Sequence, residues 1–208
     1  MHLYESSIPS GNVYKVYLLL AHLGLEYTTT SLNILGQDPE TRAPEFLALN
    51  KNGRVPVLVL DDGTPLAESN AILFYLAEGT RYLPDSKLGR AQVLQWLFFE
   101  QYSHEPYVAV WKACTYWFGW GDRTENEIRK LKEKGQAAIE VMEKHLEGKK
   151  FFVGEEYSIA DIALFAYTSA AEAIGFEVGK NVKEWLGRVQ KVEGFVSIKK
   201  DETGKYPL

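Results

Sequence analysis

A cluster of hydroxyl side chains near the start of the chain could do chemistry. The segment S-S-I-P-S-G-N, residues 6–12, is followed by an apolar run, V-Y-L-L-L-A, at residues 16–21. A serine at the end of such a turn caps the next helix by accepting a bond from a free backbone N–H. Its own proton stays available, because a hydroxyl has one donor and two acceptor lone pairs. The segment therefore predicts either a plain strand-to-helix turn or a turn that holds a reactive hydroxyl at a helix start.

Few other residues have the types and spacing that catalysis needs. The four histidines, His2, His22, His104 and His145, form neither a Cys/His pattern nor H-E-x-x-H, so no metal site is expected. The sequence contains no glycine-rich phosphate-binding motif. The single cysteine, Cys114, lies in A-C-T-Y-W-F, a setting typical of a buried and inert thiol.

Charge and hydropathy argue against nucleic-acid and membrane partners. The formal net charge is -5, and the few lysine-rich spots are interleaved with acidic residues, which indicates a solvated surface. No apolar run approaches the roughly 18 residues that span a bilayer, and no signal peptide is evident. One cysteine cannot form an intramolecular disulfide, which fits a reducing compartment. We therefore expect a cytoplasmic protein.

The first eighty residues alternate between strand-like and helix-like periodicity. The Asp-Gly turn at residues 61–64 is a strong hairpin signal. The predicted order is β-α-β-α-β-β-α, in which the first strands pair in parallel and the hairpin adds an antiparallel edge. Strands are expected at 2–5, 26–32, 55–60 and 65–67, and helices at 13–23, 44–49 and 68–78.

The rest of the chain has helical periodicity. A polar segment, T-R-Y-L-P-D-S at residues 80–86, is typical of a linker. A helix is expected over 88–113 with a break at Pro106, a second over 124–146, a third after the capping box S-I-A-D at 158–161, and a fourth near 182–192. The pattern predicts a small α/β domain joined to a larger all-helical one, with a ligand cleft between them.

Three segments carry a resemblance to a known family. R-V-P-V at 54–57, A-E-S-N-A-I at 67–72 and S-I-A-D at 158–161 resemble the glutathione transferase superfamily, and the likeness covers essentially the whole chain. L-N-K-N-G-R-V-P-V-L is similar to bacterial members, which often carry Asn-Pro where this chain has Asn50-Lys51. The resemblance implies a thioredoxin-like, glutathione-binding domain over 1–79, a linker over 80–87 and an all-α domain over 88–208 that supplies most of a hydrophobic substrate pocket. Members are commonly homodimers.

The resemblance assigns most of the glutathione site. Pro56 is cis in the family, so that the backbone of Val55 can pair with the cysteinyl unit of glutathione as an added strand would. Glu68 and Ser69, at a helix start, would hold the ammonium and the carboxylate of the γ-glutamyl end, which Asn70 could also reach. The alternatives are a proline at an edge strand, an acid near the helix dipole and a simple N-cap at Ser69.

Two further groups depend on the resemblance. Arg54 is a better candidate than Lys51 for the glycyl carboxylate, although exposed loop cations usually face solvent. Serine-type members (theta-, nu- or beta-like) place the serine that contacts sulfur about three residues before the apolar body of the first helix. That position is Ser10, with Asn12 two residues later, while Ser6 and Tyr4 remain alternatives. The loop holds no cysteine, which argues against the cysteine-type branches.

A hydroxyl at a helix start can lower the pKa of the glutathione thiol by the amount that the reaction requires. The thiol of glutathione is comparable to cysteine, with a pKa of about 8.5, and lowering it by two pH units requires about 2.7 kcal/mol. A hydrogen bond to a charged group supplies roughly 1.5–3 kcal/mol and a helix N-terminus roughly 0.3–1 kcal/mol. We therefore expect a glutathione transferase that conjugates the thiolate of its co-substrate, glutathione, to a small hydrophobic electrophile without a metal.

Two questions stay open at this point, the activity of the chain and the role of one aromatic pair. The chain could instead be a non-catalytic binding or scaffold protein of the same fold, or a glutathione-dependent reductase or peroxidase. Tyr107 and Trp111 lie four residues apart and share a helix face, so they could line the hydrophobic substrate pocket. Packing in the core is an equally good interpretation of this aromatic pair.

Overall fold

The computed structural model describes residues 1–198 and begins with a mixed four-stranded sheet. Its strands are β1 (His2–Ser6), β2 (Thr28–Leu32), β3 (Val57–Val59) and β4 (Pro65–Ala67), in the spatial order β2-β1-β3-β4. β1 and β2 are parallel because helix α1 (Gly11–Leu23) connects them, whereas β3 is antiparallel to β1 and β4. The predicted thioredoxin-like βαβαββα order is confirmed.

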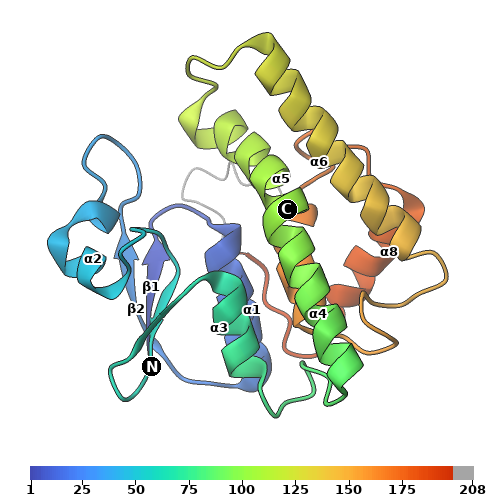
Figure 1. The fold of residues 1–208 in the computed structure, drawn as a ribbon, viewed down its shortest axis with the longest axis horizontal. Helices are drawn as coiled ribbons and strands as arrows, with labels where there is room; N and C mark the ends of the chain where they lie inside the picture. The colour runs from blue at the N-terminus through green and yellow to red at the C-terminus, as the bar shows by residue number, and fades with distance from the viewer. Residues whose placement is uncertain (199–208) are drawn as a thin grey trace.

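Alternate residues of β1 contact the helices on opposite faces of the sheet. Leu3 is fully buried and packs with Val13 and Ile72, which belong to α1 and to α3 (Ser69–Ala77). Tyr4 points the other way, and its ring lies 5.7 Å from that of Phe46 in α2 (Pro44–Leu49). A short 3₁₀ turn (Glu40–Arg42) precedes α2. Helices α1 and α3 therefore cover one face of the sheet and α2 the other (Figure 1).

The second half is helical, as expected. It consists of α4 (Lys87–Phe99), α5 (Glu105–Ala113), α6 (Glu125–His145), α7 (Ile159–Thr168) and α8 (Lys180–Val189). The break expected at Pro106 takes a different form: Pro106 lies in the first turn of α5, where its missing N–H is harmless, and a π-helical turn (Glu100–His104) joins α4 to α5. A second π-helical turn (Cys114–Phe118) follows α5.

Helix α7 lies at the centre of the molecule. All ten of its residues are buried, as its apolar sequence predicts. The capping box is present: Asp161 accepts a bond from the backbone N–H of Ser158, and the Ser158 hydroxyl accepts one from the helix start. Asp161 also accepts a bond from the indole N–H of Trp185 in α8, at 2.9 Å.

The main hydrophobic core crosses from one half of the chain to the other. Tyr14 and Leu18 of α1 and Leu73 of α3 belong to the same buried cluster as Ile162 and Phe165 of α7. Helix α1 thus packs on the sheet with one side and on α7 with the other. The N-terminal turn of α1 is thereby held at the junction of the two halves.

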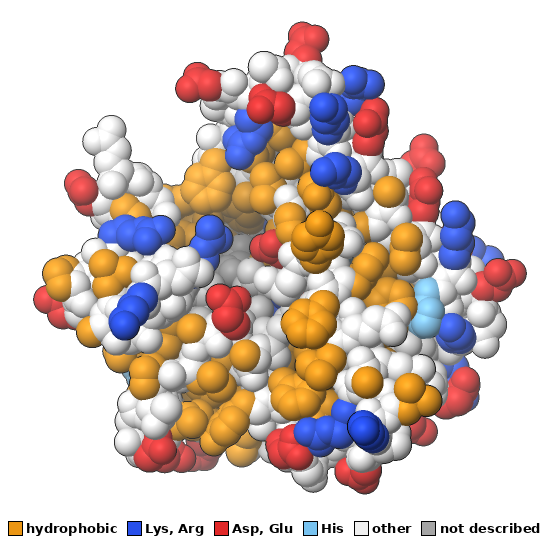
Figure 2. All heavy atoms as spheres, viewed as in Figure 1, with side chains coloured by type: hydrophobic (Ala, Val, Ile, Leu, Met, Phe, Trp, Pro, Cys, Tyr) orange, Lys and Arg blue, Asp and Glu red, His pale blue; other side chains and the backbone are white. Residues whose placement is uncertain are grey.

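The surface drawn in Figure 2 carries hydrophobic side chains along its front and is hollowed between the α/β half and helices α4 and α5. Several large apolar side chains are exposed, among them Tyr75 of α3 and Phe98 of α4, at 53% and 69%. Across residues 1–198, no helix has the length and apolar character that crossing a membrane requires.

Candidate functional site: the start of helix α1

Ser10 is the N-cap of α1. Its backbone is extended, with φ -107° and ψ 124°, and its side chain accepts a bond from the N–H of Val13 at 3.4 Å. The other two candidates for the sulfur contact have other contacts: Ser6 accepts a bond from the N–H of Ile8 at 3.2 Å, and Tyr4 packs on α2. Among these three side chains, only Ser10 caps α1.

Tyr167, which the sequence interpretation missed, lies against the same helix start. Its hydroxyl accepts a bond from the backbone N–H of Asn12 at 3.2 Å. Its ring also covers Gly11: a Cβ atom at that position would lie 2.6 Å from two ring carbons. Glycine is therefore required next to Ser10 because an aromatic ring of α7 fills the space.

The start of α3 is unusual at Glu68. This residue is the N-cap and has φ 70° and ψ 111°, the only positive φ of a non-glycine residue among the described ones. Such a conformation costs of order 1–3 kcal/mol and is commonest at functional sites. Ser69 is the first residue of the helix, so the interpretation of Ser69 as a simple N-cap is wrong. Glu68 is exposed, whereas Ser69 is buried.

A buried ion pair connects these two helix starts. Lys15 of α1 and Glu100 of the first π-helical turn have side chains with no exposure, and Nζ lies 2.8 Å from Oε1. Lys15 also donates to Oδ1 of Asn12 at 2.8 Å, and Asn70 donates to Oε2 of Glu100 at 3.0 Å. The Ser69 hydroxyl donates to Oδ1 of Asn12 at 3.3 Å. The structure thus joins Asn12, Ser69 and Asn70, three of the residues predicted to bind the ligand.

Burial perturbs several ionisable groups around this network. It raises the pKa of Glu105, an effect that Lys15 opposes, and Oε1 of Glu105 accepts a bond from the Asn12 amide at 3.4 Å. Burial lowers the pKa of Lys112 to about 7, and its Nζ lies 5.5 Å from the centre of the Tyr167 ring. The start of α1 therefore lies next to ionisable groups of both signs, the buried Lys15 and the half-buried Glu105, and next to the ring of Tyr167.

The loop before β3 lies at the other end of the predicted site. The Val55-Pro56 peptide bond is cis, as the family resemblance implied. Arg54 is exposed, and its backbone carbonyl oxygen accepts a bond from the side-chain amide of Asn50 at 2.8 Å. Arg54 acts electrostatically on Glu105, whose carboxylate accepts a bond from Asn12. The roles of Arg54 and Val55 in binding stay predictions.

Tyr107 and Trp111 face α6 and the turn before α8. The indole N–H of Trp111 donates to the carbonyl of Ile174 at 3.0 Å, and the Tyr107 hydroxyl accepts a bond from Lys134 of α6 at 3.3 Å. These are the contacts of the packing interpretation. The structure does not join the pair to Ser10, and a role in the substrate pocket stays a prediction.

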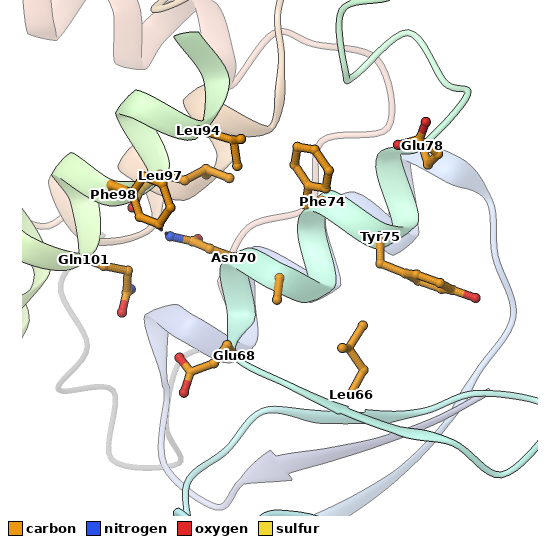
Figure 3. Close-up of a pocket in the computed structure, with 11 residues that line it drawn as sticks. Leu66, Glu68, Asn70, Phe74, Tyr75, Glu78, Leu94, Leu97, Phe98 and Gln101 are labelled. Carbon is orange, nitrogen blue, oxygen red and sulfur yellow. Dashed lines mark hydrogen bonds between the residues drawn. The ribbon is translucent and has the colours of Figure 1, made fainter. Parts of the chain in front are cut away.

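An apolar pocket of about 740 Å³ lies between α3 and α4. Figure 3 shows Phe74 and Tyr75 of α3 on one side, Leu94 and Phe98 of α4 on the other, and Asn70 directed toward α4. Glu68 and Gln101 also line it, so the pocket reaches the start of α3. Within residues 1–198, no group of three or more His, Cys, Asp or Glu side chains is arranged to hold a metal.

Two residues of the site were missed although the sequence carried a signal for them. Lys15 interrupts the apolar run V-Y-K-V-Y-L-L-L, and Glu100 interrupts W-L-F-F-E-Q. A charged residue inside an apolar helical segment is rarely buried unless it is paired. Tyr167 gave no such signal, because a tyrosine in an apolar helix fits an ordinary core.

Comparison with known proteins identifies the family to which the chain belongs. Residues 9–78 match the family model described as glutathione S-transferase, N-terminal domain, and residues 93–192 match that of the C-terminal domain. A solved glutathione S-transferase from Pseudomonas fluorescens is 47% identical with a TM-score of 0.88, covering 94% of this chain and 97% of its own.

Two other similar proteins carry more specific descriptions. The disulfide-bond oxidoreductase YfcG of Escherichia coli is 32% identical over 191 residues, covering 88% of this chain and 87% of the relative. A glutathione transferase from Pseudomonas putida, solved with one glutathione disulfide per subunit, is 29% identical with a TM-score of 0.78, covering 93% of this chain and 87% of its own. With both domain models matched in order and these relatives aligned over most of their length, the chain belongs to the glutathione S-transferase family.

Proposed function

We propose that the protein is a serine-type glutathione transferase in which Ser10 stabilises the glutathione thiolate. The observation that carries the proposal is the position of Ser10 as N-cap of α1, beside a network that joins Asn12, Ser69 and Asn70. The hydroxyl accepts from Val13 through a lone pair, so its proton can be donated to a sulfur anion outside the helix.

The reaction needs no general base from the protein. Glutathione loses its thiol proton to solvent when it binds, because the hydrogen bond from Ser10 favours the anion. The thiolate then attacks an electrophilic carbon of a small hydrophobic substrate and forms a carbon–sulfur bond. A leaving group such as halide departs with the electron pair of the bond that breaks.

The ends of glutathione are assigned by charge. The γ-glutamyl end lies at the start of α3, where Glu68 receives the ammonium and the Ser69 hydroxyl, together with the backbone N–H of Asn70, receives the carboxylate. The cysteinyl unit pairs with the backbone of Val55 beside Pro56, and Arg54 receives the glycyl carboxylate. The unusual backbone of Glu68 supports this assignment, because such conformations are concentrated at functional sites and the residue is exposed at the helix start.

Binding and conjugation test the proposal directly. The protein should be retained on immobilised glutathione and should conjugate glutathione to an activated aryl halide. Ser10→Ala should slow conjugation at least tenfold with an unchanged thermal unfolding midpoint, whereas Ser6→Ala should leave the rate within twofold. An equal loss in Ser6→Ala, or none in Ser10→Ala, would show that the thiolate is held by another group.

A second function is favoured by two of the relatives. YfcG is described as a disulfide-bond oxidoreductase, and the Pseudomonas putida relative was solved with glutathione disulfide. At the same site, the thiolate of glutathione would attack one sulfur of a small disulfide, form a mixed disulfide between glutathione and that sulfur, and release the other sulfur as a thiolate. No protein cysteine is required, and Cys114 is buried. Turnover of a small dialkyl disulfide tests this activity, and binding without either turnover would indicate a non-catalytic binding protein.

We also propose a cytoplasmic homodimer. The reaction consumes a reduced thiol, which the cytosol maintains. The apolar pocket between α3 and α4, together with exposed Tyr75 and Phe98, is the face that we assign to the second subunit. Contiguous exposed apolar surface of this kind marks an interaction site on a monomer.

A further inference from the structure

The Lys15–Glu100 pair is buried where three site residues meet. Both side chains have no exposure, and the pair is 85 residues apart in sequence. Lys15 contacts Asn12 at 2.8 Å and the Ser69 hydroxyl at 3.5 Å, while Glu100 accepts from the Asn70 amide at 3.0 Å. Each partner of the ion pair therefore holds side chains of the proposed γ-glutamyl site.

Stability alone does not account for such a pair. Removing two charges from water costs about as much as their attraction returns, and well-packed apolar residues are often equally stable in their place. Buried ion pairs can instead specify one arrangement of the groups around them. The buried cluster to which α1 and α4 contribute is otherwise made of apolar side chains such as Leu18 and Val93, so apolar packing between these helices is available to the fold.

The local backbone supports a positioning role for Glu100. The residue opens the π-helical turn between α4 and α5, and such turns are concentrated at functional sites. Glu100 uses Oε1 for Lys15 and Oε2 for Asn70 and Gln101, the latter at 2.9 Å. Because Asn70 donates both to Glu100 and to the carbonyl of Leu97, its amide has one orientation.

We propose that Lys15 and Glu100 are positioning residues that set the geometry of Asn12, Ser69 and Asn70, and thereby the affinity of the site for γ-glutamyl peptides. The inference rests on the proposed function, since it concerns the same ligand. The pair acts from behind these side chains and determines the subsite for one end of glutathione. It also makes that subsite dependent on the helical half of the chain, because Glu100 follows α4.

The test removes both charges at once, since a single substitution would strand a buried charge. The double variant Lys15→Met/Glu100→Met keeps the volume and loses the pair. Binding of glutathione and of γ-glutamylcysteine, which lacks the glycyl end, is measured by calorimetry, together with kcat, KM and thermal unfolding. Arg54→Gln is the control for the opposite end, and Lys183→Met/Glu172→Met removes an exposed ion pair that lies in another part of the fold.

We expect the double variant to bind both ligands at least tenfold more weakly, and the factor to be the same for the two ligands. KM for glutathione should rise equally, with kcat at saturation within threefold of the wild type and the unfolding midpoint close to that of the wild type. Arg54→Gln should weaken the binding of glutathione only, and Lys183→Met/Glu172→Met should leave the affinity for both ligands unchanged.

Three outcomes would overturn the inference. Wild-type affinity for both ligands in the Lys15→Met/Glu100→Met variant would mean that the pair does not set the site. Failure of this variant to fold would mean that the role of the pair is structural. If the wild-type protein binds neither ligand, the proposed function is wrong and the inference falls with it, a result distinct from the first two because it is obtained on the wild type alone.

Discussion

The hydroxyl of Tyr167 in α7 accepts a hydrogen bond from the backbone N–H of Asn12 in α1, across 155 residues of sequence. One of the free N–H groups at the start of α1 is therefore satisfied by a side chain from the helical half. Ser10 satisfies a second one, that of Val13. The start of α1 is thus completed by the C-terminal half of the chain.

Loss of this hydroxyl should weaken the fold modestly. In Tyr167→Phe the ring still packs, but Asn12 loses its acceptor, so the free energy of unfolding should fall by about 1 kcal/mol. Urea denaturation measures the change. Tyr102→Phe is the matched control, because Tyr102 is 83% exposed, and it should have no effect. Equal stability of Tyr167→Phe and the wild type would mean that water replaces the hydroxyl at no cost.

A methyl group at Gly11 should be poorly tolerated. Gly11→Ala places a Cβ 2.6 Å from the Tyr167 ring, so we expect a loss of about 1–3 kcal/mol in unfolding free energy and slower conjugation. Gly187→Ala is the control: it lies inside α8 with open space around it, and should raise stability by about 0.5–1 kcal/mol.

The clash itself can be tested in a mutant cycle. If the ring of Tyr167 causes the loss, the cost of Gly11→Ala should shrink when it is made together with Tyr167→Ala. Additive losses would mean that the backbone of α1, and not the ring, excludes the methyl group.

His104 should make stability depend on acidity. Burial lowers its pKa from 6.5 to about 4, opposed by Glu100 and assisted by Lys15. The unfolded chain then binds a proton between these two values that the folded chain does not, so stability falls as the pH drops from 6.5 to 4. The full effect is about 3 kcal/mol, at about 1.4 kcal/mol per unit of pKa.

The measurement compares the wild type with His104→Gln by urea denaturation from pH 7.5 to 4.5. Burial raises the pKa of Asp161 to about 6, so this residue makes the folded protein more stable as the pH falls and partly masks the effect of His104. Asp161 is present in both proteins, so its contribution cancels in the comparison. The free energy of unfolding of the wild type should therefore fall relative to that of the variant as the pH falls. A constant difference would mean that His104 takes up its proton in the folded state as readily as in the unfolded chain.

The proposed dimer face can be tested at Phe98. This side chain is 69% exposed and lines the pocket between α3 and α4. Phe98→Glu places a charge in an apolar interface and should convert the dimer to a monomer in sedimentation equilibrium. Phe118→Glu, also at an exposed phenylalanine, should leave the dimer intact. A dimer that persists in Phe98→Glu would place the interface elsewhere.

Local signals in the sequence predicted the elements well. The hairpin at 61–64 and the capping box at 158–161 depend on residues a few positions apart, and both form as expected. The interruption between α4 and α5 was expected at Pro106, but a π-helical turn takes its place because proline is tolerated in the first turn of a helix. A π-helical turn has no comparable sequence signal.

The parts of the site that sequence could not predict depend on distant contacts. Neither the partner of Lys15 nor that of Asn12 follows from local periodicity, because 85 and 155 residues separate them. The conformation of Glu68 was also unexpected, since a positive φ favours glycine and the residue is an acid. The family resemblance supplied Ser10 and Ser69, but the contacts that orient them came from the fold.

The core that α1 shares with α7 limits how the chain can be recombined with its relatives. A fragment that ended after α3 would expose Tyr14, Leu18 and Leu73, which the helical half now covers. A chimera that took residues 9–78 from one family member and 93–192 from another would join two unmatched faces of one core. Exchange of parts should therefore keep α1 and α7 together as a unit, although they are the most distant helices of the site along the chain.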